Sequence, residues 1–476
     1  MLDVIIIGGG IVGCALLREL SKYKLNCLLL EKEEDVAVSC TKANSGIVHA
    51  GYDPAPDTKK ARFNLLGNLM YKDLAKQLGV AFEQCGSLVL ANGQGLPLLK
   101  ELLERGKINS VKNLEILNRE QILEIEPNIA DEIFYALYAP TAGIVSPYEM
   151  AIALAEQAVI NGAEIKLNSQ VTNIISSPYG YTVKTGDRQY QCKYLVNAAG
   201  YGASQINIMA GGREIPYTFL RGEYYILDTS ERKYFNHTCF PLPDHRGKGV
   251  LVSPTAEGNI IVGPSSLPVQ SGGDGAVKKE GLDFIKNSVS RVMKNVNFSK
   301  VIRVFSGVRA VSGEDFIIER EGNLITLAGI CSPGLTAAPA IARYAVEELL
   351  TGAGLKLVKK EEYLPRPRKI ITKELSKEEL QQLIKQNPAY SKMVCRCEKI
   401  TEGEIIDALN SPLKPLSLDA VKRRVRAGMG RCQGGFCTPR VMEIISRRAN
   451  IPFDIVTKKG GQSTVIVGSV KEGNND

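Results

Sequence analysis

Three kinds of segment are missing from this sequence of 476 residues, and each absence narrows the class of protein. No apolar run approaches the roughly 20 residues that a membrane-spanning helix needs, which leaves only peripheral contact with a membrane open. The chain opens on its first strand-like run, without the charged region, long apolar region and cleavage site of a secretory leader, so we expect a cytoplasmic protein. No basic stretch interleaved with aromatic residues is present, which argues against a nucleic-acid partner.

Histidine is also scarce, and only one of the three histidines stands in a sequence context that favours chemistry. His237 and His245 lie in loop-like sequence, where an exposed or loop-ordering side chain is the simpler interpretation. The composition is otherwise that of an ordinary globular protein, with 44% hydrophobic and 23% charged residues and room for two or three domains. The net charge of +8 fits solvated basic faces, and it also fits an anionic substrate or an acidic partner.

The beginning of the chain has the pattern of a nucleotide-binding strand, turn and helix. Val4 to Ile7 form a run typical of a strand that is covered on both faces. Three glycines follow at the spacing G-x-G-x-x-G, which permits a tight turn, close approach to a pyrophosphate and close helix packing: Gly8, Gly10 and Gly13. A second apolar run, Cys27 to Leu30, ends at Glu31, whose carboxylate suits a ribose hydroxyl and argues against a 2′-phosphate. The pattern predicts a dinucleotide, and it leaves FAD and NAD both open.

A stretch of small residues at 39–54 carries the next motif, N-S-G-x-x-H-A-G, with the residues Asn44, Ser45, Gly46, His49, Ala50 and Gly51. This motif resembles the FAD-dependent oxidoreductases of the D-amino-acid oxidase class, in the branch that contains L-2-hydroxyglutarate dehydrogenases and one type of glycerol-3-phosphate dehydrogenase. The resemblance implies that Asn44, Ser45 and Gly46 run beside the isoalloxazine and that His49 faces the substrate. The alternative is a histidine that only orders the loop.

Two later strand ends extend the resemblance. Tyr194 to Asn197 lead into a small-residue turn containing Ala199 and Gly200, which in this class passes close to the dinucleotide and supports FAD over NAD. Leu324 to Ala328 lead into a glycine-proline turn and a helix, whose N-terminal amides suit the negative charge of a reduced flavin. The resemblance places four residues of this turn against the flavin ring and ribityl chain: Ser332, Gly334, Leu335 and Thr336.

Two arginines are candidates for binding an anionic substrate. Arg309 follows Gly307 and Val308, and this glycine is expected to bend the backbone so that the guanidinium points inward and grips a carboxylate or phosphate. In the resembling enzymes this arginine anchors the substrate; the alternative is an ion pair with Glu314 or Asp315. Arg221 belongs to R-G-E-Y-Y, which resembles the hydroxyglutarate dehydrogenase branch, and it either faces substrate or is an ordinary salt-bridged strand residue.

Seven of the eleven cysteines are scattered singly, and we interpret most of these as buried small hydrophobes. The other four form two close pairs: Cys395, Cys397, Cys432 and Cys437. Four thiolates suit zinc or an iron-sulfur cluster, although a zinc ribbon favours C-x-x-C, and an unfilled redox-sensing set is a third interpretation. Residues 393–450 resemble the bacterioferritin-associated ferredoxin-like domain, which implies a 2Fe-2S cluster.

The predicted fold is an α/β FAD-binding Rossmann-like domain with an antiparallel-sheet substrate domain and a small helical C-terminal iron-sulfur domain. The FAD-binding domain is expected to be discontinuous. The linker that follows it is expected to contain an amphipathic helix near Ser376 to Lys385. The expected boundaries are 1–75, 143–215 and 300–353 for the FAD-binding domain, 76–142 and 216–299 for the substrate-binding domain, 354–390 for the linker, 391–455 for the 2Fe-2S domain and 456–476 for a tail.

Together the motifs predict a dehydrogenase that passes electrons on singly, because an oxidase that gave both electrons to dioxygen would not need the cluster. We expect oxidation of sn-glycerol 3-phosphate to dihydroxyacetone phosphate, with Arg309 and Arg221 on the phosphate and His49 as the base. The first alternative is an L-2-hydroxyglutarate or other 2-hydroxyacid dehydrogenase, followed by an amino-acid or opine dehydrogenase. Another alternative is an electron-transfer subunit without its own substrate. A partner electron-transfer subunit is expected as the acceptor.

Overall fold

Strands buried on both faces build the first sheet of the computed structural model, which describes residues 1–243 and 249–468. Strand β1 (Leu2–Ile7) lies between β2 (Cys27–Leu30) and β12 (Arg188–Asn197) and runs parallel to both. β20 (Leu324–Ala328) extends the parallel part beyond β12. The eight-stranded sheet is completed by β9 (Glu164–Lys166), β10 (Asn173–Ser177), β11 (Gly180–Thr185) and β19 (Ile317–Glu321).

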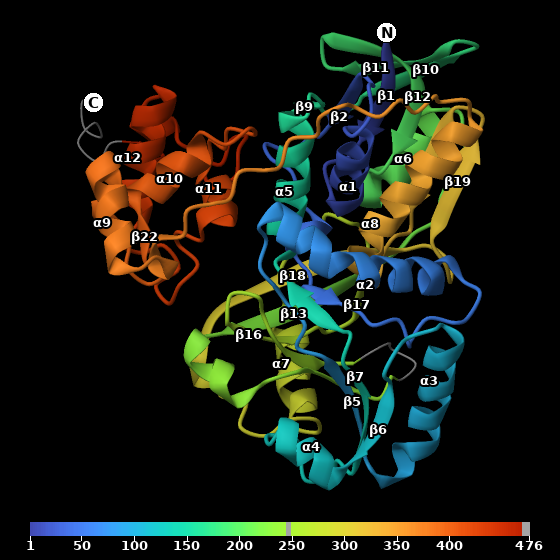
Figure 1. The fold of residues 1–476 in the computed structure, drawn as a ribbon, viewed down its shortest axis with the longest axis vertical. Helices are drawn as coiled ribbons and strands as arrows, with labels where there is room; N and C mark the ends of the chain where they lie inside the picture. The colour runs from blue at the N-terminus through green and yellow to red at the C-terminus, as the bar shows by residue number, and fades with distance from the viewer. Residues whose placement is uncertain (244–248, 469–476) are drawn as a thin grey trace, which may run out of the picture. The chain divides into compact units, whose positions relative to one another are not determined.

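Helices that follow these strands pack on one another beside the sheet (Figure 1). Helix α1 (Ile11–Leu20) contacts α5 (Pro147–Ile160) and α8 (Gly334–Tyr344), and α8 contacts α2 (Lys59–Leu78). α2 and α8 approach at Gly67, where a Cβ would lie 1.9 Å from the carbonyl oxygen of Thr336. Helix α8 also contacts β3 (Ile47–Val48), which lies within the N-S-G-x-x-H-A-G motif. Helix α6 (Ala203–Met209) contacts β10, β12 and β20.

A second sheet has nine strands and is largely antiparallel (Figure 1). Its longest pairing joins β13 (Thr218–Leu227) to β18 (Val301–Val311). Because β18 belongs to this sheet, the sheet extends to residue 311, beyond the boundary at 299 that the sequence predicted. The other strands are β5 (Ser87–Ala91), β6 (Glu115–Asn118), β7 (Tyr135–Ala139), β14 (Thr238–Pro241), β15 (Leu251–Pro254), β16 (Ile260–Gly263) and β17 (Leu267–Val269), and α3 (Leu96–Ile108), α4 (Arg119–Ile125) and α7 (Lys279–Val289) accompany them.

A three-stranded sheet of short strands fixes the loop that carries the N-S-G-x-x-H-A-G motif. β3 (Ile47–Val48), in the middle of the motif, pairs with β8 (Gly143–Val145), which in turn pairs with β4 (Phe82–Glu83). Two segments almost 100 residues apart in sequence are thereby joined, with Ile47 opposite Ile144. Backbone hydrogen bonds between β3 and β8 therefore hold the motif in place, in addition to the contacts within its own loop.

The chain divides into two units: residues 1–31 and 36–366 form unit 1, and residues 32–35 and 367–476 form unit 2. Unit 2 is mainly helical, with α9 (Lys377–Gln386), α10 (Glu402–Leu409), α11 (Leu418–Val425), α12 (Thr438–Ala449) and the short strands β21 (Met393–Cys395) and β22 (Ile400–Thr401). The helix expected near Ser376 is present and begins with a capping box between Ser376 and Glu379. It contacts the turn at residues 388–391, so part of the expected linker is folded into unit 2. The predicted fold class is confirmed.

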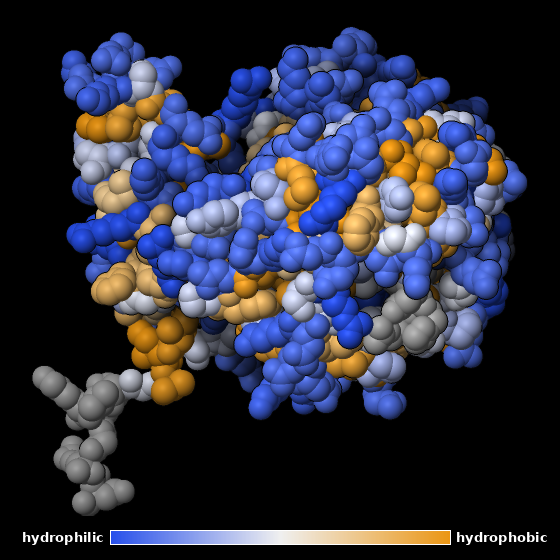
Figure 2. Space-filling model, turned by 90° about the horizontal axis from the view of Figure 1, so that it is seen from below, coloured by the Kyte–Doolittle hydropathy of each residue, from blue (hydrophilic) through white to orange (hydrophobic). Residues whose placement is uncertain are grey.

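Part of the expected tail is also folded, because Val456 is fully buried in the core of unit 2 and Thr457 pairs with Thr464. His245 and residues 469–476 lie outside the described residues. Figure 2 shows a face on which hydrophilic residues predominate and apolar residues form separated patches. Of the helices in the described ranges, none has the length and apolar content to cross a membrane.

Candidate functional site

The glycine turn after β1 is shaped by direct contact between backbone atoms. Gly8 has φ +109°, and a Cβ there would lie 2.5 Å from the carbonyl oxygen of Ala198 at the end of β12. A Cβ on Gly13 would lie 2.0 Å from the carbonyl oxygen of Gly8, so α1 packs directly on the turn. Gly10 is the N-cap of α1, and the Ile11 N–H donates to the Thr41 hydroxyl at 3.0 Å, so the positive end of the helix dipole at this turn favours a phosphate. Glu31 accepts a hydrogen bond of 2.6 Å from the Gly9 N–H, so its carboxylate lies at the same turn.

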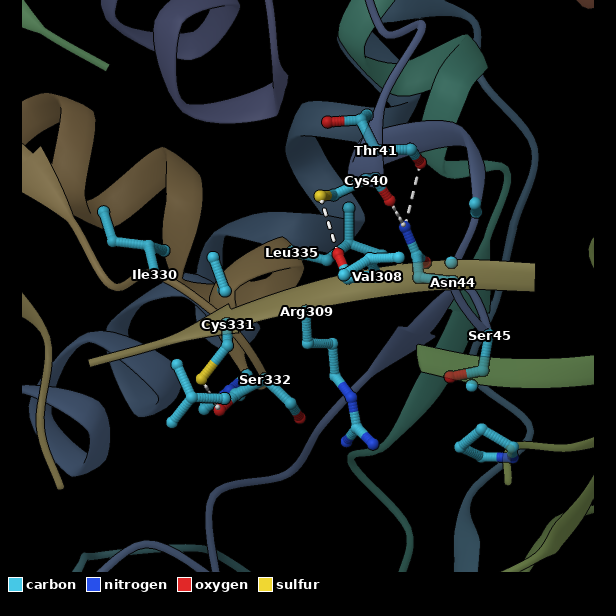
Figure 3. Close-up of a pocket in the computed structure, with 18 of the residues that line it drawn as sticks. Cys40, Thr41, Asn44, Ser45, Val308, Arg309, Ile330, Cys331, Ser332 and Leu335 are labelled. Atoms are coloured by element: carbon cyan, nitrogen blue, oxygen red, sulfur yellow. Dashed lines mark hydrogen bonds between the residues drawn. The ribbon is translucent and has the colours of Figure 1, made fainter. Parts of the chain in front are cut away.

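A second wall is formed by residues 40–49, which the side chain of Asn44 organises (Figure 3). Its amide nitrogen donates to the carbonyl oxygens of Cys40 and Thr41 at 3.1 and 2.8 Å, and its oxygen accepts from the Gly46 N–H at 2.9 Å. Gly46 has φ +70°, and a Cβ there would lie 2.6 Å from the carbonyl oxygen of Val145. This asparagine and glycine therefore shape the loop, and Ser45 is left facing the cavity.

The turn from β20 to α8 forms a third wall. Figure 3 shows Ile330, Cys331 and Ser332 on the opposite side of Arg309 from the Asn44 loop. Thr336, in the first turn of α8, is fully buried, and its hydroxyl accepts a 2.9 Å hydrogen bond from the His49 N–H. Thr336 therefore contacts the backbone of the candidate base rather than lining the cavity.

These walls enclose a cavity of about 660 Å³ in unit 1. Seven of the residues that were expected to contact a cofactor line it: Gly10, Asn44, Ser45, Gly200, Ser332, Gly334 and Leu335. The remaining six are not among its lining residues: Gly8, Gly13, Glu31, Gly46, Ala199 and Thr336. Both His49 and Arg309 line the cavity, so the structure brings the candidate base and the candidate anion anchor together.

His49 is fixed at its backbone and at its ring. Its carbonyl oxygen accepts from the side-chain amides of Asn64 and Asn68 at 3.3 and 3.1 Å. Its ring stacks on Phe240 with centroids 6.0 Å apart, and Nε2 lies 3.4 Å from the Ser332 hydroxyl. The imidazole therefore has a defined direction within the cavity, as a general base requires.

Arg309 extends from β18 into the cavity (Figure 3), and its guanidinium donates to the Ser266 hydroxyl at 3.2 Å. Asp315, a sequence candidate for its partner, instead accepts from the backbone N–H groups of Lys59 and Lys60 at 2.8 and 2.9 Å. The expected backbone bend at Gly307 is wrong, because β18 pairs regularly through this residue. Gly307 instead makes room for the carbonyl oxygen of Ala43, which would lie 2.0 Å from a Cβ.

Arg221 does not line the cavity, and its side chain is in a buried ion pair. Its Nε donates to the Glu223 carboxylate at 2.6 Å, and the side chains are 4% and 0% exposed. Because neighbouring residues of a strand point to opposite faces, the β13–β18 pairing places Arg221 and Glu223 on the face away from Arg309. The salt-bridged alternative for Arg221 therefore fits the structure, and the expected contact with substrate does not.

Several cavity residues were not singled out from the sequence. Tyr224 and Phe240 are aromatic, and Ser266 contacts Arg309. Cys40 and Cys331 are two of the seven scattered cysteines, most of which the sequence predicts to be buried small hydrophobes. Cys40 is instead exposed in the cavity, and its thiol donates to the carbonyl oxygen of Val308 at 3.0 Å. Tyr224 on β13 and Arg309 on β18 lie on the same face of the sheet. The alternation of side chains along a strand would identify Tyr224 as a cavity residue once the pairing register is known. Nothing in the sequence places the loop of Ser266 beside β18.

The four cysteines of unit 2 meet as two pairs. Cys395 and Cys437 are buried and share a hydrogen bond, whereas Cys397 is exposed and its sulfur lies 3.8 Å from that of Cys432. Within the described ranges, no group of three or more His, Cys, Asp or Glu side chains gathers around a point suited to one metal ion. Two thiol pairs fit a centre with two irons, each held by two thiolates, better than a single zinc ion.

Hydrogen bonds lower the pKa of two of the four thiols, Cys395 and Cys432. A hydrogen bond from Cys437, followed by the N–H groups of Gly428 and Glu398, lowers the pKa of Cys395 to about 6. The N–H groups of Phe436, Gly434 and Gly435 lower the pKa of Cys432, while sharing the proton with Cys395 and burial raise the pKa of Cys437. These donors would offset the negative charge of a bound cluster.

Comparison with known proteins agrees with both sites. Residues 3–348 match the family model of the FAD dependent oxidoreductases. The chain belongs to this family. Residues 393–447 match the BFD-like [2Fe-2S] binding domain, so this FAD-dependent oxidoreductase carries a second, iron-sulfur domain. The residues present fit both groups: the glycine turn and the α1 and α8 termini would hold FAD, and the four thiols would hold the cluster.

Among similar proteins, the glycerol 3-phosphate dehydrogenase of Caloramator mitchellensis is 44% identical, with 99% of each chain covered. The solved structure of dithionite-reduced L-alpha-glycerophosphate oxidase from Mycoplasma pneumoniae with FAD bound is 32% identical, with a TM-score of 0.72. It covers 77% of this oxidoreductase and 99% of its own chain. The L-2-hydroxyglutarate dehydrogenase of Escherichia coli is 30% identical, covering 66% of this chain and 74% of its own.

Loss of the buried carboxylate should destabilise this oxidoreductase strongly. Glu223→Ala leaves the Arg221 guanidinium buried without its main partner, and we expect a loss of about 3–5 kcal/mol in unfolding free energy. Urea unfolding followed by circular dichroism measures this change. The control is Glu319→Ala, which breaks the surface pair with Arg213 and should change stability by about 0–1 kcal/mol. Equal effects of the two substitutions would contradict the argument.

Metal analysis separates the interpretations of the four thiols. Protein purified without oxygen should contain iron and acid-labile sulfide in equal amounts, with two irons per chain. Cys432→Ser should lower the iron content well below that of the wild type, whereas Cys192→Ser, at a buried cysteine of unit 1, should leave it unchanged. Zinc in place of iron and sulfide in freshly purified protein would contradict a 2Fe-2S site.

Proposed function

We propose that this enzyme oxidises sn-glycerol 3-phosphate to dihydroxyacetone phosphate and passes the electrons singly to a partner protein. The observation that carries the proposal is the shared cavity of His49 and Arg309 in an FAD-dependent oxidoreductase fold. A base and a fixed guanidinium on one cavity suit a substrate with a hydroxyl group at one end and an anion at the other. The likeness to a glycerol 3-phosphate dehydrogenase along 99% of the chain supports the phosphate substrate.

In this proposal His49 takes the proton of the substrate hydroxyl at Nε2. The ring nitrogen faces the Ser332 hydroxyl at 3.4 Å, so a substrate hydroxyl can occupy the same region. The His49 N–H donates to the Thr336 hydroxyl, and the His49 carbonyl oxygen accepts from the side chains of Asn64 and Asn68. Because these hydrogen bonds hold the residue, little conformational freedom has to be lost on binding.

Arg309 holds the phosphate in this proposal and thereby sets which carbon faces the base. A guanidinium offers two parallel N–H donors to a phosphate, and the Ser266 hydroxyl adds a further hydrogen-bonding group beside it. Tyr224 lines the same cavity, and its buried side chain bonds to Ser45 through its hydroxyl, so this part of the cavity wall is partly apolar and held by a hydrogen bond.

Bound FAD would accept the two electrons that the substrate loses, and a 2Fe-2S cluster accepts one electron at a time. The fused cluster domain therefore favours a dehydrogenase with a protein acceptor over an oxidase. The Mycoplasma oxidase structure matches only 77% of this chain, with 99% of its own length covered. This agrees with an added domain that serves another acceptor.

A 2-hydroxyacid such as L-2-hydroxyglutarate is the second candidate substrate. The N-S-G-x-x-H-A-G and R-G-E-Y-Y motifs and the likeness to the Escherichia coli dehydrogenase favour it. In that case Arg309 binds a carboxylate, for which the same two N–H donors are suited.

Anaerobic mixing distinguishes these substrates from an electron-transfer subunit without a substrate of its own. We expect sn-glycerol 3-phosphate to bleach the flavin band near 450 nm without any partner protein. Bleaching by L-2-hydroxyglutarate alone would replace the phosphate with a carboxylate substrate. If the flavin reacts with neither compound, the proposed substrate is wrong.

Replacement of His49 should slow the chemical step more than it weakens binding. For His49→Ala we expect flavin reduction at saturating substrate to slow by about 10²–10⁴-fold, because the proton acceptor is lost. Stopped-flow absorbance measures this rate. His237→Ala is the matched control, since His237 bonds to Glu126 and lies outside the cavity lining. A near-wild-type rate for His49→Ala would show that His49 only orders its loop.

Replacement of Arg309 should chiefly weaken binding. Arg309→Ala should raise the KM for the anionic substrate by about 10- to 100-fold, because a hydrogen-bonded charge pair is lost. Arg309→Lys keeps the charge but loses the paired donors, so its KM should lie between those of Arg309→Ala and the wild type. Arg303→Ala, on the same strand and exposed, should leave the KM unchanged. An unchanged KM for Arg309→Ala would exclude an anchoring role.

A further inference from the structure

One side of the thiol site in unit 2 is exposed. Cys395 and Cys437 are 2% and 3% exposed, whereas Cys397 is exposed and Cys432 is half-buried. Gly430 packs on the exposed pair, since a Cβ there would lie 2.3 Å from the Cβ of Cys397. The Cys397–Cys432 pair therefore lies at the surface of unit 2, and the Cys395–Cys437 pair belongs to its core.

An aromatic side chain stands beside this exposed pair. Phe436 is 89% exposed, although burying a phenylalanine ring is worth about 1.5–3 kcal/mol. The backbone N–H of Phe436 donates a hydrogen bond to the Cys432 sulfur. The backbone of Phe436 is thus held next to a cluster ligand, and its ring is open to solvent. Exposed aromatic residues of this kind are typical anchors of protein interfaces.

Positive charge surrounds the same residues. Between residues 420 and 442 the sequence contains six Lys or Arg residues and no Asp or Glu, and residues 391–455 contain twelve basic and seven acidic residues. Arg396 and Arg431 are exposed and directly precede Cys397 and Cys432. We call the surface formed by Arg396, Cys397, Arg431, Gly435 and Phe436 the thiol face.

Ion pairs cancel part of this charge. Arg423 and Arg424 are buried and contact the Asp35 carboxylate at 2.8 and 2.7 Å. Glu398 accepts from Arg426 at 2.9 Å. Glu402 is nearly buried and is bonded by both Arg440 and Arg447, with Lys392 at 3.9 Å. Basic residues still outnumber acidic ones over residues 391–455, and Arg396 is exposed beside Cys397, so an acidic surface is the complementary one.

We propose that the thiol face docks an acidic one-electron carrier protein, with Phe436 as the apolar anchor and Arg396 as the charged contact. The proposal rests on the proposed function only in assuming that electrons leave through unit 2. In each encounter the carrier would gain one electron and a 2Fe-2S cluster held by the four thiolates would lose one, and no bond forms or breaks. A substrate that loses two electrons therefore reduces two carrier molecules.

The test uses the full-length holoenzyme reduced with dithionite, from which excess reductant has been removed, so it needs no substrate. The probes are oxidised cytochrome b5, an acidic one-electron carrier, and oxidised cytochrome c, a basic one. We expect the bimolecular rate with cytochrome b5 to fall about tenfold between low and high salt, and about tenfold in Arg396→Glu at low salt. The rate with cytochrome c should not fall with salt. Phe436→Ser should slow the cytochrome b5 reaction several-fold at either salt concentration.

Controls separate docking from damage to the cluster. Arg448→Glu makes the same change of charge as Arg396→Glu, but on α12, about ten residues beyond Cys437. It should leave the rate with cytochrome b5 near that of the wild type. All variants should retain wild-type iron content and the same electron paramagnetic resonance spectrum when reduced. Calorimetric titration with oxidised cytochrome b5 adds a readout without electron transfer, and binding should weaken in Arg396→Glu and Phe436→Ser.

Three results would overturn the proposal. One is an unchanged rate and affinity for cytochrome b5 in both thiol-face variants. Another is a preference for cytochrome c at low salt. The third is slower passage of electrons from the flavin to the cluster in these variants with unchanged delivery to cytochrome b5, which would assign the thiol face to unit 1. Failure of sn-glycerol 3-phosphate to bleach the flavin would contradict the proposed substrate and leave this test valid.

Discussion

Backbone contact between the first glycine turn and the end of β12 is the constraint on which the catalytic unit depends. Gly8 and Ala198 are so close that any side chain at Gly8 would collide with a carbonyl oxygen. Since β1, β12 and β20 are parallel neighbours, the turns that follow them open at one edge of the sheet. Gly10, Gly200 and Ser332 reach one cavity for this reason, although they are separated by more than 100 residues in sequence.

The β13–β18 pairing supplies the opposite side of the cavity and sorts its side chains by the alternation of a strand. Gly222, Tyr224, Gly307 and Arg309 share one face and line the cavity. Arg221 and Glu223 point to the other face, where Glu223 also accepts a hydrogen bond from the Ser265 hydroxyl. The buried pair therefore supports the segment that carries Ser266, the residue that contacts Arg309.

The features that could be predicted from the sequence are those determined by neighbouring residues. The β-branched run and glycine spacing define β1 and α1, and the close cysteine pairs define the thiol site, because each pattern lies within a short segment. Arg221 and Arg309 looked equivalent as strand arginines, and only the pairing register shows that they face opposite ways. The sequence predicted that Gly307 bends its strand. The structure shows instead that a glycine is needed there because Ala43, from a distant segment, approaches its backbone. The cavity positions of Cys40 and Ser266 likewise depend on tertiary packing that local patterns do not encode.

On the proposed function, the two sites make different demands on their surroundings. The cavity has to fix a proton acceptor and an anion anchor, and it does so with backbone hydrogen bonds, an aromatic contact and a neutral hydroxyl beside Arg309. The thiol site has one pair in the core and one at the surface, so it can be held rigidly and still be reached from outside. Because both sites are on one chain, passage between them does not depend on protein concentration, whereas delivery to a separate carrier depends on collision and charge. The excess of basic residues around the thiols is therefore explained by the second step, in which two proteins have to find each other.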